Sequence, residues 1–317
     1  MDKGIKRTFI PGDKWIYFKL YTGYKTADNI LSKTLPAIIS QLNTENVLDK
    51  WFFIRYSDPK FHLRLRFCLK DAKNISSVIS LFNREMSPYI DEDLIWKVQI
   101  DTYQRELERY GTTTMEHSES MFHFDSEAIL SILSILSIPE YNESDQQRWL
   151  LALKILDALL FDFELGMDQK IALLTELSED FKKEMGFTIK GYKLQLDKKF
   201  RTHRKLIEEI MGTPEQASWA IPLMEIIRQR SLKVKPIAGT LLQMEMNQKL
   251  EVSLHSLLRS YIHMTINRLF RSKQRVYELV IYDMLERYYS SLKARSKNTA
   301  GKMHRASIEA LPQVVIT

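Results

Sequence analysis

Arginine and histidine side chains recur through one short stretch of the chain that otherwise has the composition of buried β-structure. Residues 51–67 read WFFIRYSDPKFHLRLRF, and two runs of aromatic and aliphatic residues flank the turn sequence SDPK. Proline fixes φ and aspartate can accept a hydrogen bond from its own backbone, so this stretch predicts a β-hairpin. Because strand side chains alternate between faces, His62, Arg64 and Arg66 are expected on one face of its second strand.

The basic residues of this predicted face are mostly arginine, whose chemistry differs from that of lysine. A guanidinium group is planar and donates two parallel hydrogen bonds to a carboxylate or a phosphate. Arginine at a period of two therefore predicts a pocket for an anionic group, and Arg55 on the first strand is a further binding candidate. The alternative is an ordinary basic sheet face exposed to water, which is where most charged side chains lie.

A second cluster of arginines follows a predicted core strand, in residues 103–111, YQRELERYG. Arg105 and Arg109 would be neighbours either on a strand or on a helix, and the sequence does not decide between these conformations. Arg105 is the stronger candidate for binding a ligand, because it directly follows the strand and a strand end is a rigid support. A lattice of Arg–Glu salt bridges is the alternative for Arg109 and for its neighbours Glu106 and Glu108.

Residues 253–270, SLHSLLRSYIHMTINRLF, predict a helix that carries a polar stripe. The stripe recurs every four residues and consists of His255, Arg259, His263 and Asn267. Histidine exchanges a proton near neutral pH, so His263 is a candidate general acid or base. A hydrogen-bonded structural role is the alternative for each of these histidines.

Composition restricts the remaining classes of site. The 317 residues contain seven histidines and one cysteine, Cys68, at no spacing typical of a metal site, and no intramolecular disulfide can form. No Gly-rich phosphate loop, dinucleotide fingerprint or hydrolase motif occurs, so neither a metal nor a cofactor is expected. The lone thiol, the charged N-terminus and the lack of a long apolar run predict a soluble cytoplasmic protein without membrane insertion.

Strands and helices alternate in the first third of the chain, and helices dominate the rest. Hydrophobic periodicity predicts strands at residues 15–21 and 95–103 and helices at residues 26–42 and 72–85. Later helices are expected at residues 126–136, 146–163, 167–185, 192–211 and 246–295, with breaks at Gly186, Gly212 and Pro236. The pattern predicts an α+β fold in which an N-terminal sheet with the hairpin packs on a mainly helical part. Residues 1–296 would form one domain and residues 297–317 a C-terminal tail.

Four segments of the chain occur in the order found in one family. They are WFFIRYSDPKFHLRLRF, YQRELERYG, MFHFDS and SYIHMTINRLF. Through them the chain resembles the C-terminal elimination domain of class I lantibiotic dehydratases, also called the thiopeptide-type bacteriocin biosynthesis domain. The resemblance covers about residues 15–289, and it departs from the family pattern at Thr112, where a second glycine usually follows Gly111.

The resemblance implies a lyase. In that family a glutamyl group from glutamyl-tRNA is esterified onto Ser or Thr of a ribosomally made precursor peptide. The elimination domain then removes glutamate to leave dehydroalanine or dehydrobutyrine. Since the chain lacks the larger glutamylation region, the resemblance implies a stand-alone elimination subunit of a split dehydratase. Its partners would be the precursor peptide and the separate glutamylating subunit, with a cyclase and a second copy of the chain as further candidates.

The resemblance also implies roles for individual residues. Catalytic roles fall on Arg64, Arg66, Arg105 and His263. The arginines would bind the glutamyl carboxylate and stabilise the negative charge that develops during elimination, while the histidine would move the proton. Apart from the resemblance, Arg55 and Asn267 are supporting candidates for substrate binding because of their position beside these groups, and His62 is a further candidate.

The sequence is also compatible with three other functions, namely cycloaddition, a scaffold role and RNA binding. Relatives of the family form a pyridine ring by cycloaddition in thiopeptide maturation, and a non-catalytic scaffold subunit would present the peptide to the glutamylating partner. Retention of the hairpin arginines and of His263 favours elimination over cycloaddition. RNA binding through the basic residues between positions 268 and 305 is the least favoured, because no aromatic platform is interleaved with them.

Overall fold

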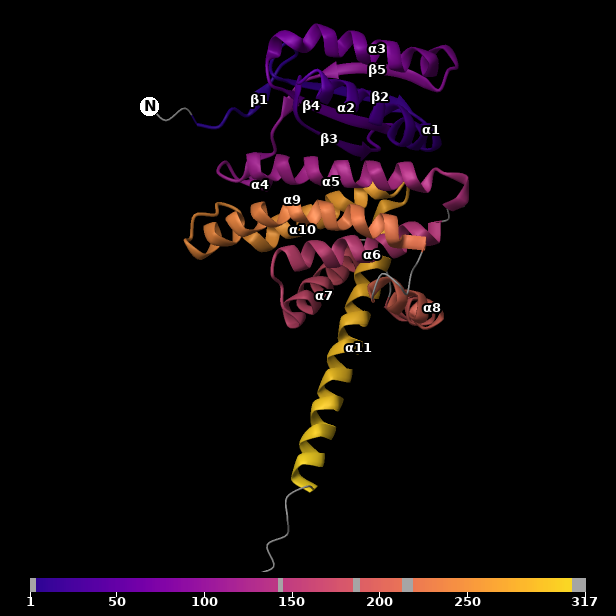
Figure 1. Cartoon of the computed structure of the whole chain (residues 1–317), viewed down its shortest axis with the longest axis vertical. Coiled ribbons are helices and arrows are strands. Elements are labelled where there is room, and N and C mark those ends of the chain that lie inside the picture. The colour runs from indigo at the N-terminus through magenta and orange to yellow at the C-terminus, as the bar shows by residue number, and fades with distance from the viewer. Residues whose placement is uncertain (1–3, 142–144, 185–188, 213–218, 310–317) are drawn as a thin grey trace, which may run out of the picture.

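A computed structural model of the chain shows two layers, a β-sheet with its own helices and a larger helical layer below it (Figure 1). The structure describes residues 4–141, 145–184, 189–212 and 219–309. Within this part of the chain the strands lie in the first third, and helices make up most of the remainder. The predicted α+β fold, an N-terminal sheet packed on a mainly helical part, is thereby confirmed.

Four antiparallel strands form the main sheet in the order β3-β4-β2-β5. Their bounds are Trp15–Thr22 for β2, Leu48–Tyr56 for β3, His62–Leu69 for β4 and Ile95–Asp101 for β5. The predicted hairpin is therefore present as β3 and β4. A separate two-stranded sheet is formed by β1 (Thr8–Phe9) and β6 (Tyr103–Gln104).

The helices of the sheet layer pack on one face of the main sheet. Phe82 stacks on Phe18 of β2 with ring centres 3.9 Å apart, and it meets Phe67 of β4 edge-on. Phe82 belongs to the amphipathic helix that its hydrophobic spacing predicted. The helices of this layer are α1 (Tyr24–Asn29), the π-helical turn η1 (Ile30–Thr34), α2 (Leu35–Thr44), the 3₁₀ turn η2 (Ala72–Asn74) and α3 (Ile75–Asp91).

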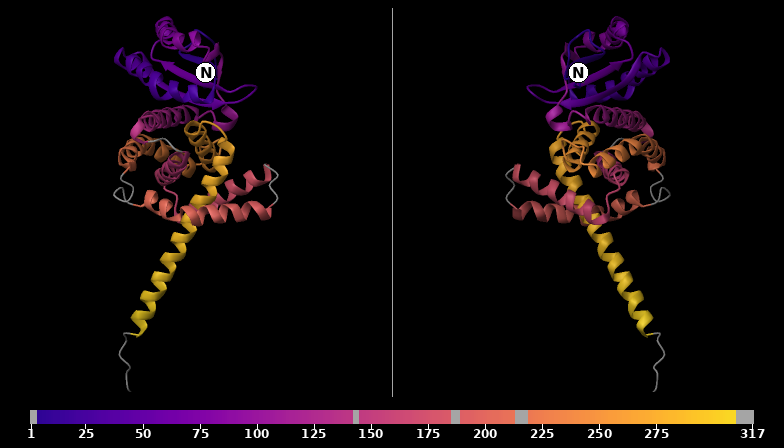
Figure 2. Two further views of the ribbon diagram at one scale, coloured as in Figure 1. Left: turned by 90° about the vertical axis from the view of Figure 1, so that its right-hand side faces the viewer. Right: turned by 90° about the vertical axis from the view of Figure 1, so that its left-hand side faces the viewer.

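The helical layer begins with α4 and α5, and α5 lies between the sheet and the other helices (Figure 1). Its members are α4 (Leu107–Tyr110), α5 (Met115–Leu136), η3 (Pro139–Tyr141), α6 (Asp145–Asp162), α7 (Met167–Glu184), α8 (Ile189–Met211), α9 (Ile221–Met246), α10 (Leu254–Leu269) and α11 (Gln274–Glu309). Figure 2 shows α11 leaving this layer on the side away from the sheet. None of the helices in the described ranges combines the length and apolar character needed to cross a bilayer.

Side chains from α5 and α10 close the outer edge of the main sheet at β3. The backbone N–H groups of Phe53 and Arg55 donate to Ser126 Oγ at 3.3 Å and to Asn267 Oδ1 at 3.0 Å. The carbonyl oxygen of Phe53 accepts from Arg268 Nε at 2.9 Å. An uncovered sheet edge would leave these backbone groups unpaired, so the two helices fix the orientation of the hairpin on the helical layer.

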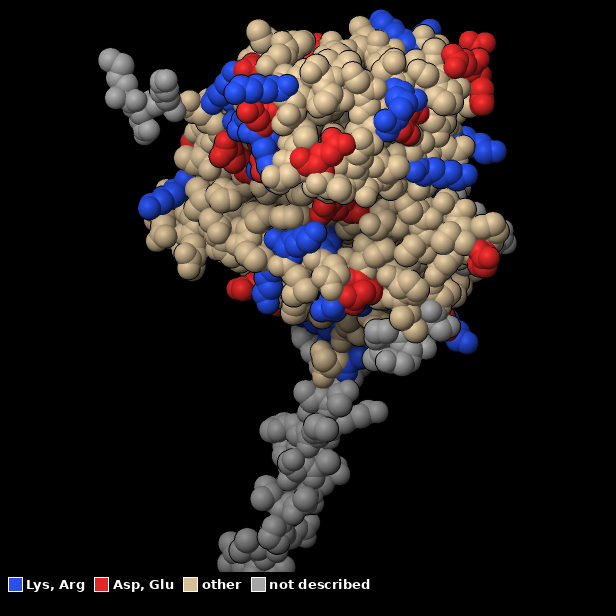
Figure 3. Space-filling model, turned by 45° about the horizontal axis from the view of Figure 1, so that its top comes forward, with Lys and Arg blue, Asp and Glu red and all other residues tan. Residues whose placement is uncertain are grey.

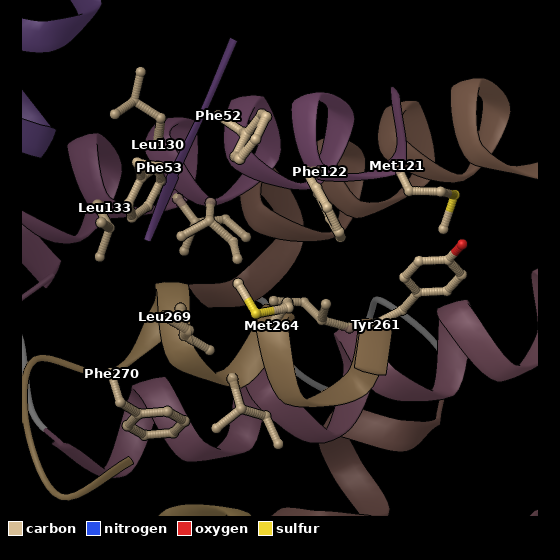
Figure 4. Close-up of a cluster of buried hydrophobic side chains, with 14 of the residues drawn as sticks. Phe52, Phe53, Met121, Phe122, Leu130, Leu133, Tyr261, Met264, Leu269 and Phe270 are labelled. Carbon is tan, nitrogen blue, oxygen red and sulfur yellow. The ribbon is translucent and has the colours of Figure 1, made fainter. Parts of the chain in front are cut away.

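The two layers share one hydrophobic core, part of which is shown in Figure 4. Phe122 of α5 lies 5.3 Å from Phe52 of β3 and 6.2 Å from Tyr261 of α10, measured between ring centres. Burial of an aromatic ring contributes about 2 kcal/mol. Helix α5 therefore joins the hairpin to α10 by packing as well as by hydrogen bonds.

The structure differs from the predicted helices in several places. Helix α5 begins at Met115, well before the predicted start at residue 126. Pro236 does not separate elements but lies inside α9, where the neighbouring Val234 and Ala238 are fully buried; this packing outweighs the backbone hydrogen bond that proline removes. The single helix predicted for residues 246–295 is divided, because Phe270 is extended and Lys273 has a φ of 54°.

Two further predictions concern segments that the structure describes only in part or not at all: the C-terminal tail and the break at Gly186. Helix α11 continues to Glu309, into the stretch that was predicted as a tail. Residues 310–317 and the predicted break at Gly186 lie outside the described residues.

Candidate active site

The predicted basic face of the hairpin meets a row of side chains from the neighbouring strand β2. In the register of the two strands, the residue pairs are Arg66 with Tyr17, Arg64 with Lys19 and His62 with Tyr21. Lys19 forms an ion pair with Asp101 of β5, so its charge is neutralised within the sheet. Neither hairpin arginine has an acidic partner among the described residues; both lie over aromatic rings.

Arg66 lies in an aromatic enclosure. The residue is 7% exposed, and its guanidinium carbon is 4.4 Å from the ring centre of Tyr17, 4.9 Å from that of Tyr103 and 5.3 Å from that of Phe52. Cation–π contacts stabilise a guanidinium group by about 1 kcal/mol each. They do not use its N–H groups, which remain available to an anion.

Two polar atoms at this enclosure are buried without a hydrogen-bond partner in the described part of the chain. They are Nε of Arg66 and the hydroxyl of Tyr17. Burial raises the pKa of Tyr17, so its hydroxyl stays neutral and can donate. A ligand with acceptor atoms that entered this enclosure could satisfy both groups.

A small pocket beside Arg66 has walls from both layers. It is lined by Phe52, Ile54, Arg66, Tyr103, Gln104, Glu106, Tyr110, Met115, Phe122 and Met264. Most of this lining is apolar, and Glu106 supplies an acidic side chain. The described residues include no group of three or more His, Cys, Asp and Glu side chains arranged to hold a metal ion.

Arg64 and His62 form a hydrogen-bonded pair next to this site. Nδ1 of His62 donates to the carbonyl oxygen of Lys60 at 2.8 Å, and Nε2 accepts from Nε of Arg64 at 3.1 Å. Burial, followed by the charges of Arg64 and Lys19, lowers the pKa of His62, which favours the neutral ring that this arrangement needs. The guanidinium carbon of Arg64 lies 3.4 Å from the ring centre of Tyr56. His62 therefore orients Arg64.

Arg105 is enclosed and fully engaged within the protein. It is 2% exposed, and its Nε and Nη2 donate to the two carboxylate oxygens of Glu119 at 2.7 Å each. Nη1 donates to the carbonyl oxygen of Lys6 at 3.0 Å. The same carboxylate accepts from the Tyr103 hydroxyl at 2.9 Å. Arg105 is thus linked through Glu119 to Tyr103, whose ring packs against Arg66.

Arg55 and Asn267 lie together, and both hold β3 to other elements instead of facing either pocket. The carboxamide of Asn267 bonds the N–H and the carbonyl oxygen of Arg55 at 3.0 and 2.8 Å. The buried Arg55 side chain pairs with Asp28 at 2.6 Å. Although burial opposes ionisation, Arg55, Arg148 and Arg271 together lower the pKa of Asp28 to about 2. This ion-pair cluster joins the sheet layer to α6 and to the segment between α10 and α11.

His263 lines a second pocket, of about 380 Å³, between α4, α7, α10 and α11. Its Nδ1 contacts Oε1 of Glu278, which is 1% exposed, and Oε2 of Glu278 accepts from Arg275 Nη1 at 3.0 Å. Nε2 of His263 has no partner among the described residues. The pocket is lined by Arg109, Leu177, Asp180, Phe181, Glu184, Ser256, Arg259, Ser260, His263, Arg275, Glu278 and Tyr282.

Arg109, which the sequence ranked below Arg105, lies in the His263 pocket. Its Nε donates to Oγ of Ser260 at 3.0 Å, and its Nη1 is 3.7 Å from Glu106, which lines the Arg66 pocket. Helices α4 and α10 form walls of both pockets, which are therefore neighbours. Arg109 and His263 thus line one pocket, and Glu106, which pairs with Arg109, lines the pocket of Arg66.

The polar stripe of α10 does not face a single site. His255 and Arg259 pair with Glu176 of α7, whereas Asn267 bonds to β3. A step of four residues advances the side-chain direction by about 40°, so the stripe turns around the helix. Both His263 and Arg259 line the pocket that also carries Arg109, but Arg259 is paired there with Glu176 and Asp180.

Charges of both signs are distributed over the described surface. Figure 3 shows acidic and basic side chains interspersed on one face, with both kinds around a hollow at mid-height. No large area of one sign dominates this face. Cys68 is buried in β4, and burial raises the pKa of its thiol to about 12, which keeps it protonated and unreactive.

Comparison with solved structures supports the arrangement of the two layers. The tRNA-dependent lantibiotic dehydratase MibB from Microbispora sp. 107891 matches with a TM-score of 0.70 and 21% identity, covering 90% of this chain and 29% of that chain. The pyridine synthase TbtD from thiomuracin biosynthesis matches with a TM-score of 0.62 and 12% identity, covering 88% of this chain and 98% of that chain. At these identities the similarity concerns the fold.

Sequence comparison identifies the family. The nisin biosynthesis protein NisB of Lactococcus lactis subsp. lactis is 33% identical over 133 residues, which are 41% of this chain and 13% of NisB. The chain thus spans less than a third of NisB and of MibB. The model of the lantibiotic biosynthesis dehydratase C-terminus matches residues 15–289. Because this match covers most of the chain, the protein belongs to the family of lantibiotic biosynthesis dehydratase C-terminal domains.

Proposed function

We propose that this protein is a lyase that removes glutamate from glutamylated Ser or Thr residues of a ribosomally made precursor peptide. The product would be dehydroalanine or dehydrobutyrine. Family membership supports a role in lantibiotic dehydration, and the two neighbouring pockets supply the groups that the elimination step requires.

Elimination requires three linked events at the glutamylated residue. A base removes the α-proton, and the electrons of that C–H bond form the Cα=Cβ double bond. The Cβ–O bond breaks, and glutamate leaves with its electron pair as a carboxylate. Negative charge develops on the peptide carbonyl and on the departing carboxylate, so cations that contact these groups lower the barrier.

The observation that carries the proposal is the Arg66 enclosure. A buried cation without an acidic partner is unfavourable unless another group supplies the anion. A glutamyl ester keeps one free carboxylate, which matches the planar donor set of Arg66 and the neutral hydroxyl of Tyr17. In this proposal Arg66 and Tyr17 bind the glutamyl carboxylate, and Arg64, oriented by His62, stabilises the charge of the ester.

The proton-transfer groups are assigned to the second pocket. His263 moves the proton, because Nε2 lacks a partner among the described residues and the imidazole lines the pocket. Arg109 stabilises the enolate-like charge, because it lies in the same pocket and its hydrogen bond goes to the neutral Ser260, while Glu106 lies 3.7 Å away. Arg105 is given a structural role, since Glu119 already occupies its donors.

The proposal implies partners and a cellular location. Because the chain spans 13% of NisB and 29% of MibB, we assign the transfer of glutamate from glutamyl-tRNA to protein sequence outside residues 1–317. The precursor peptide and that glutamylating protein are the proposed partners. Chemistry that depends on an aminoacyl-tRNA places the reaction in the cytoplasm.

Mass spectrometry of a synthetic precursor with one glutamyl-Ser ester tests the proposal. The wild-type protein should release glutamate and leave dehydroalanine, while Arg66→Met and His263→Asn should leave the ester intact. Arg84→Lys, a change at an exposed arginine on α3, should behave as the wild type. Retention of the ester by the wild type, even with the glutamylating protein added, would contradict the proposal.

The same assay separates the alternatives. A pyridine-forming enzyme would leave the ester unchanged and would instead cyclise a peptide that already carries two dehydroalanine residues. A scaffold would bind the peptide, and its His263→Asn variant would support dehydration by the partner as well as the wild type does. The match of residues 15–289 to the model of the lantibiotic biosynthesis dehydratase C-terminus favours elimination.

A further inference from the structure

Glu278 is a buried carboxylate of α11 that makes two directional contacts. Its Oε1 contacts Nδ1 of His263, and its Oε2 accepts from Arg275 at 3.0 Å. With 1% of its side chain exposed, it has no access to water as an alternative partner. Arg275 is held in turn by Glu184 of α7. The carboxylate is therefore fixed from one side while its other oxygen is directed at the imidazole.

The contact determines which nitrogen of His263 carries the proton. A carboxylate accepts hydrogen bonds and does not donate them, so the Nδ1 that faces it must be protonated. In the neutral imidazole the other nitrogen, Nε2, then has a free lone pair. Nε2 has no partner within the described ranges, so this lone pair is available to the substrate.

We propose that Glu278 is a positioning residue that makes His263 a proton acceptor in elimination. This inference rests on the proposed glutamate-eliminating function. Nε2 of His263 takes the α-proton of the glutamylated residue, the electrons of the C–H bond form the double bond, and glutamate leaves as a carboxylate. The imidazolium that results carries its second proton on Nδ1, where the negative charge of Glu278 stabilises it.

The remaining charged groups of the pocket do not compete for His263. Arg259 of α10 pairs with Glu176 and Asp180 of α7, and Arg109 of α4 donates to Ser260. Among the described residues, Glu278 is the acidic residue in contact with the imidazole. A single group therefore sets the tautomer.

The tautomer can be read without substrate by ¹⁵N NMR of protein labelled on histidine, at about pH 8, above the usual titration range of imidazole. The His263→Asn variant identifies the resonances of His263. In the wild type Nδ1 should be protonated and Nε2 should show the shift of a bare acceptor. In Glu278→Gln, whose amide can donate as well as accept, this single tautomer should be lost. A wild type protonated on Nε2, or an unchanged tautomer in Glu278→Gln, would overturn the inference.

Matched variants guard against a general structural effect. Glu278→Asp keeps the charge and should restore part of the Nδ1-protonated form. Glu184→Gln removes the second partner of Arg275 without touching His263, and it should leave the tautomer unchanged. If Glu278→Gln does not fold, the wild-type tautomer and the Glu278→Asp variant still test the inference.

Kinetics on the glutamyl-Ser peptide complete the test. Loss of the orienting carboxylate in a His–Asp pair lowers kcat by roughly 10⁴-fold in serine proteases, and Glu278→Gln should lower kcat at least a hundredfold with little change in KM. Partial recovery is expected in Glu278→Asp. Wild-type protein that shows the Nδ1 tautomer but releases no glutamate would refute the proposed function alone. Elimination at the wild-type rate by Glu278→Gln would refute the role of Glu278 alone.

Discussion

The guanidinium carbon of Arg66 lies 4.4 Å from the ring centre of Tyr17, its cross-strand neighbour, and each side chain has a buried polar atom without a partner among the described residues. Two donors from adjacent strands thus meet at one place on the sheet. The antiparallel register holds them together, so the site is rigid before any ligand binds.

Replacement of Tyr17 by Phe should weaken substrate binding without unfolding the protein. The hydroxyl has no internal partner to lose, while a hydrogen bond to a charged group contributes about 1.5 to 3 kcal/mol, or roughly ten- to hundredfold in kcat/KM. Elimination kinetics on the glutamyl-Ser peptide measure this effect. Tyr21→Phe, four residues further along β2 and on the same face of the strand, serves as the control and should stay near wild type. Equal losses in both variants would count against a specific role for Tyr17.

Arg109 and Arg105 should respond differently to replacement by Lys. Arg109 lines the His263 pocket, and loss of its planar donor set should lower kcat roughly a hundredfold, as removal of an oxyanion donor does. Its thermal unfolding should change little, because the side chain is partly exposed. Arg105→Lys should mainly lower the melting temperature. The reverse pattern would return the catalytic role to Arg105.

The buried pair of Arg105 and Glu119 predicts a large stability effect. Glu119→Gln leaves the guanidinium enclosed without its counter-charge, which should lower the free energy of unfolding by about 3 to 5 kcal/mol. Glu116→Gln is the matched control, because Glu116 lies 3.4 Å from the same arginine but is 63% exposed; surface pairs contribute less than about 1 kcal/mol. Urea denaturation compares the two. Similar losses in both variants would contradict the assignment of Glu119 as the principal partner.

Asp28 predicts a loss of stability in acid. Its pKa is lowered to about 2 from an ordinary value of 3.8, so the folded state binds its proton less readily than the unfolded state does. The resulting stabilisation is complete above the ordinary value and is lost as the pH falls through it toward 2. A shift of this size corresponds to about 2 kcal/mol. The free energy of unfolding should therefore decline between about pH 5 and pH 2, and Asp28→Asn, although less stable overall, should show a shallower decline.

Local sequence patterns predicted the parts of the structure that depend on neighbours along the chain. Strand alternation placed His62, Arg64 and Arg66 on one face, and the turn sequence SDPK marked the hairpin; both are present in β3 and β4. Helical periodicity located α6, α7 and α8 to within a few residues, whereas α3 continues to Asp91, beyond its predicted end at residue 85. It missed α9, because Pro236 was taken as a boundary.

The choice between Arg105 and Arg109 could not be made on the sequence. It depends on the backbone between β6 and α4, and on Glu119, which comes from α5 fourteen residues later and occupies the donors of Arg105. Arg105 and Arg109 carry the same side chain, so either could stabilise negative charge during elimination. Which of them faces the pocket is settled by the packing of separate elements.

The sequence by itself determined the class of fold, the family and the chemical character of the site, because these follow from residue types and short periodicities. Only the tertiary structure decided how the candidates are grouped. Asn267 and Arg55 are structural residues, because α10 packs on the edge of β3 and Asn267 bonds the backbone of Arg55 there. Glu278 of α11 contacts His263 of α10, and a turn separates the two helices. Such contacts join residues that are distant along the chain, and their burial in a shared core selects one partner among several chemically equivalent ones.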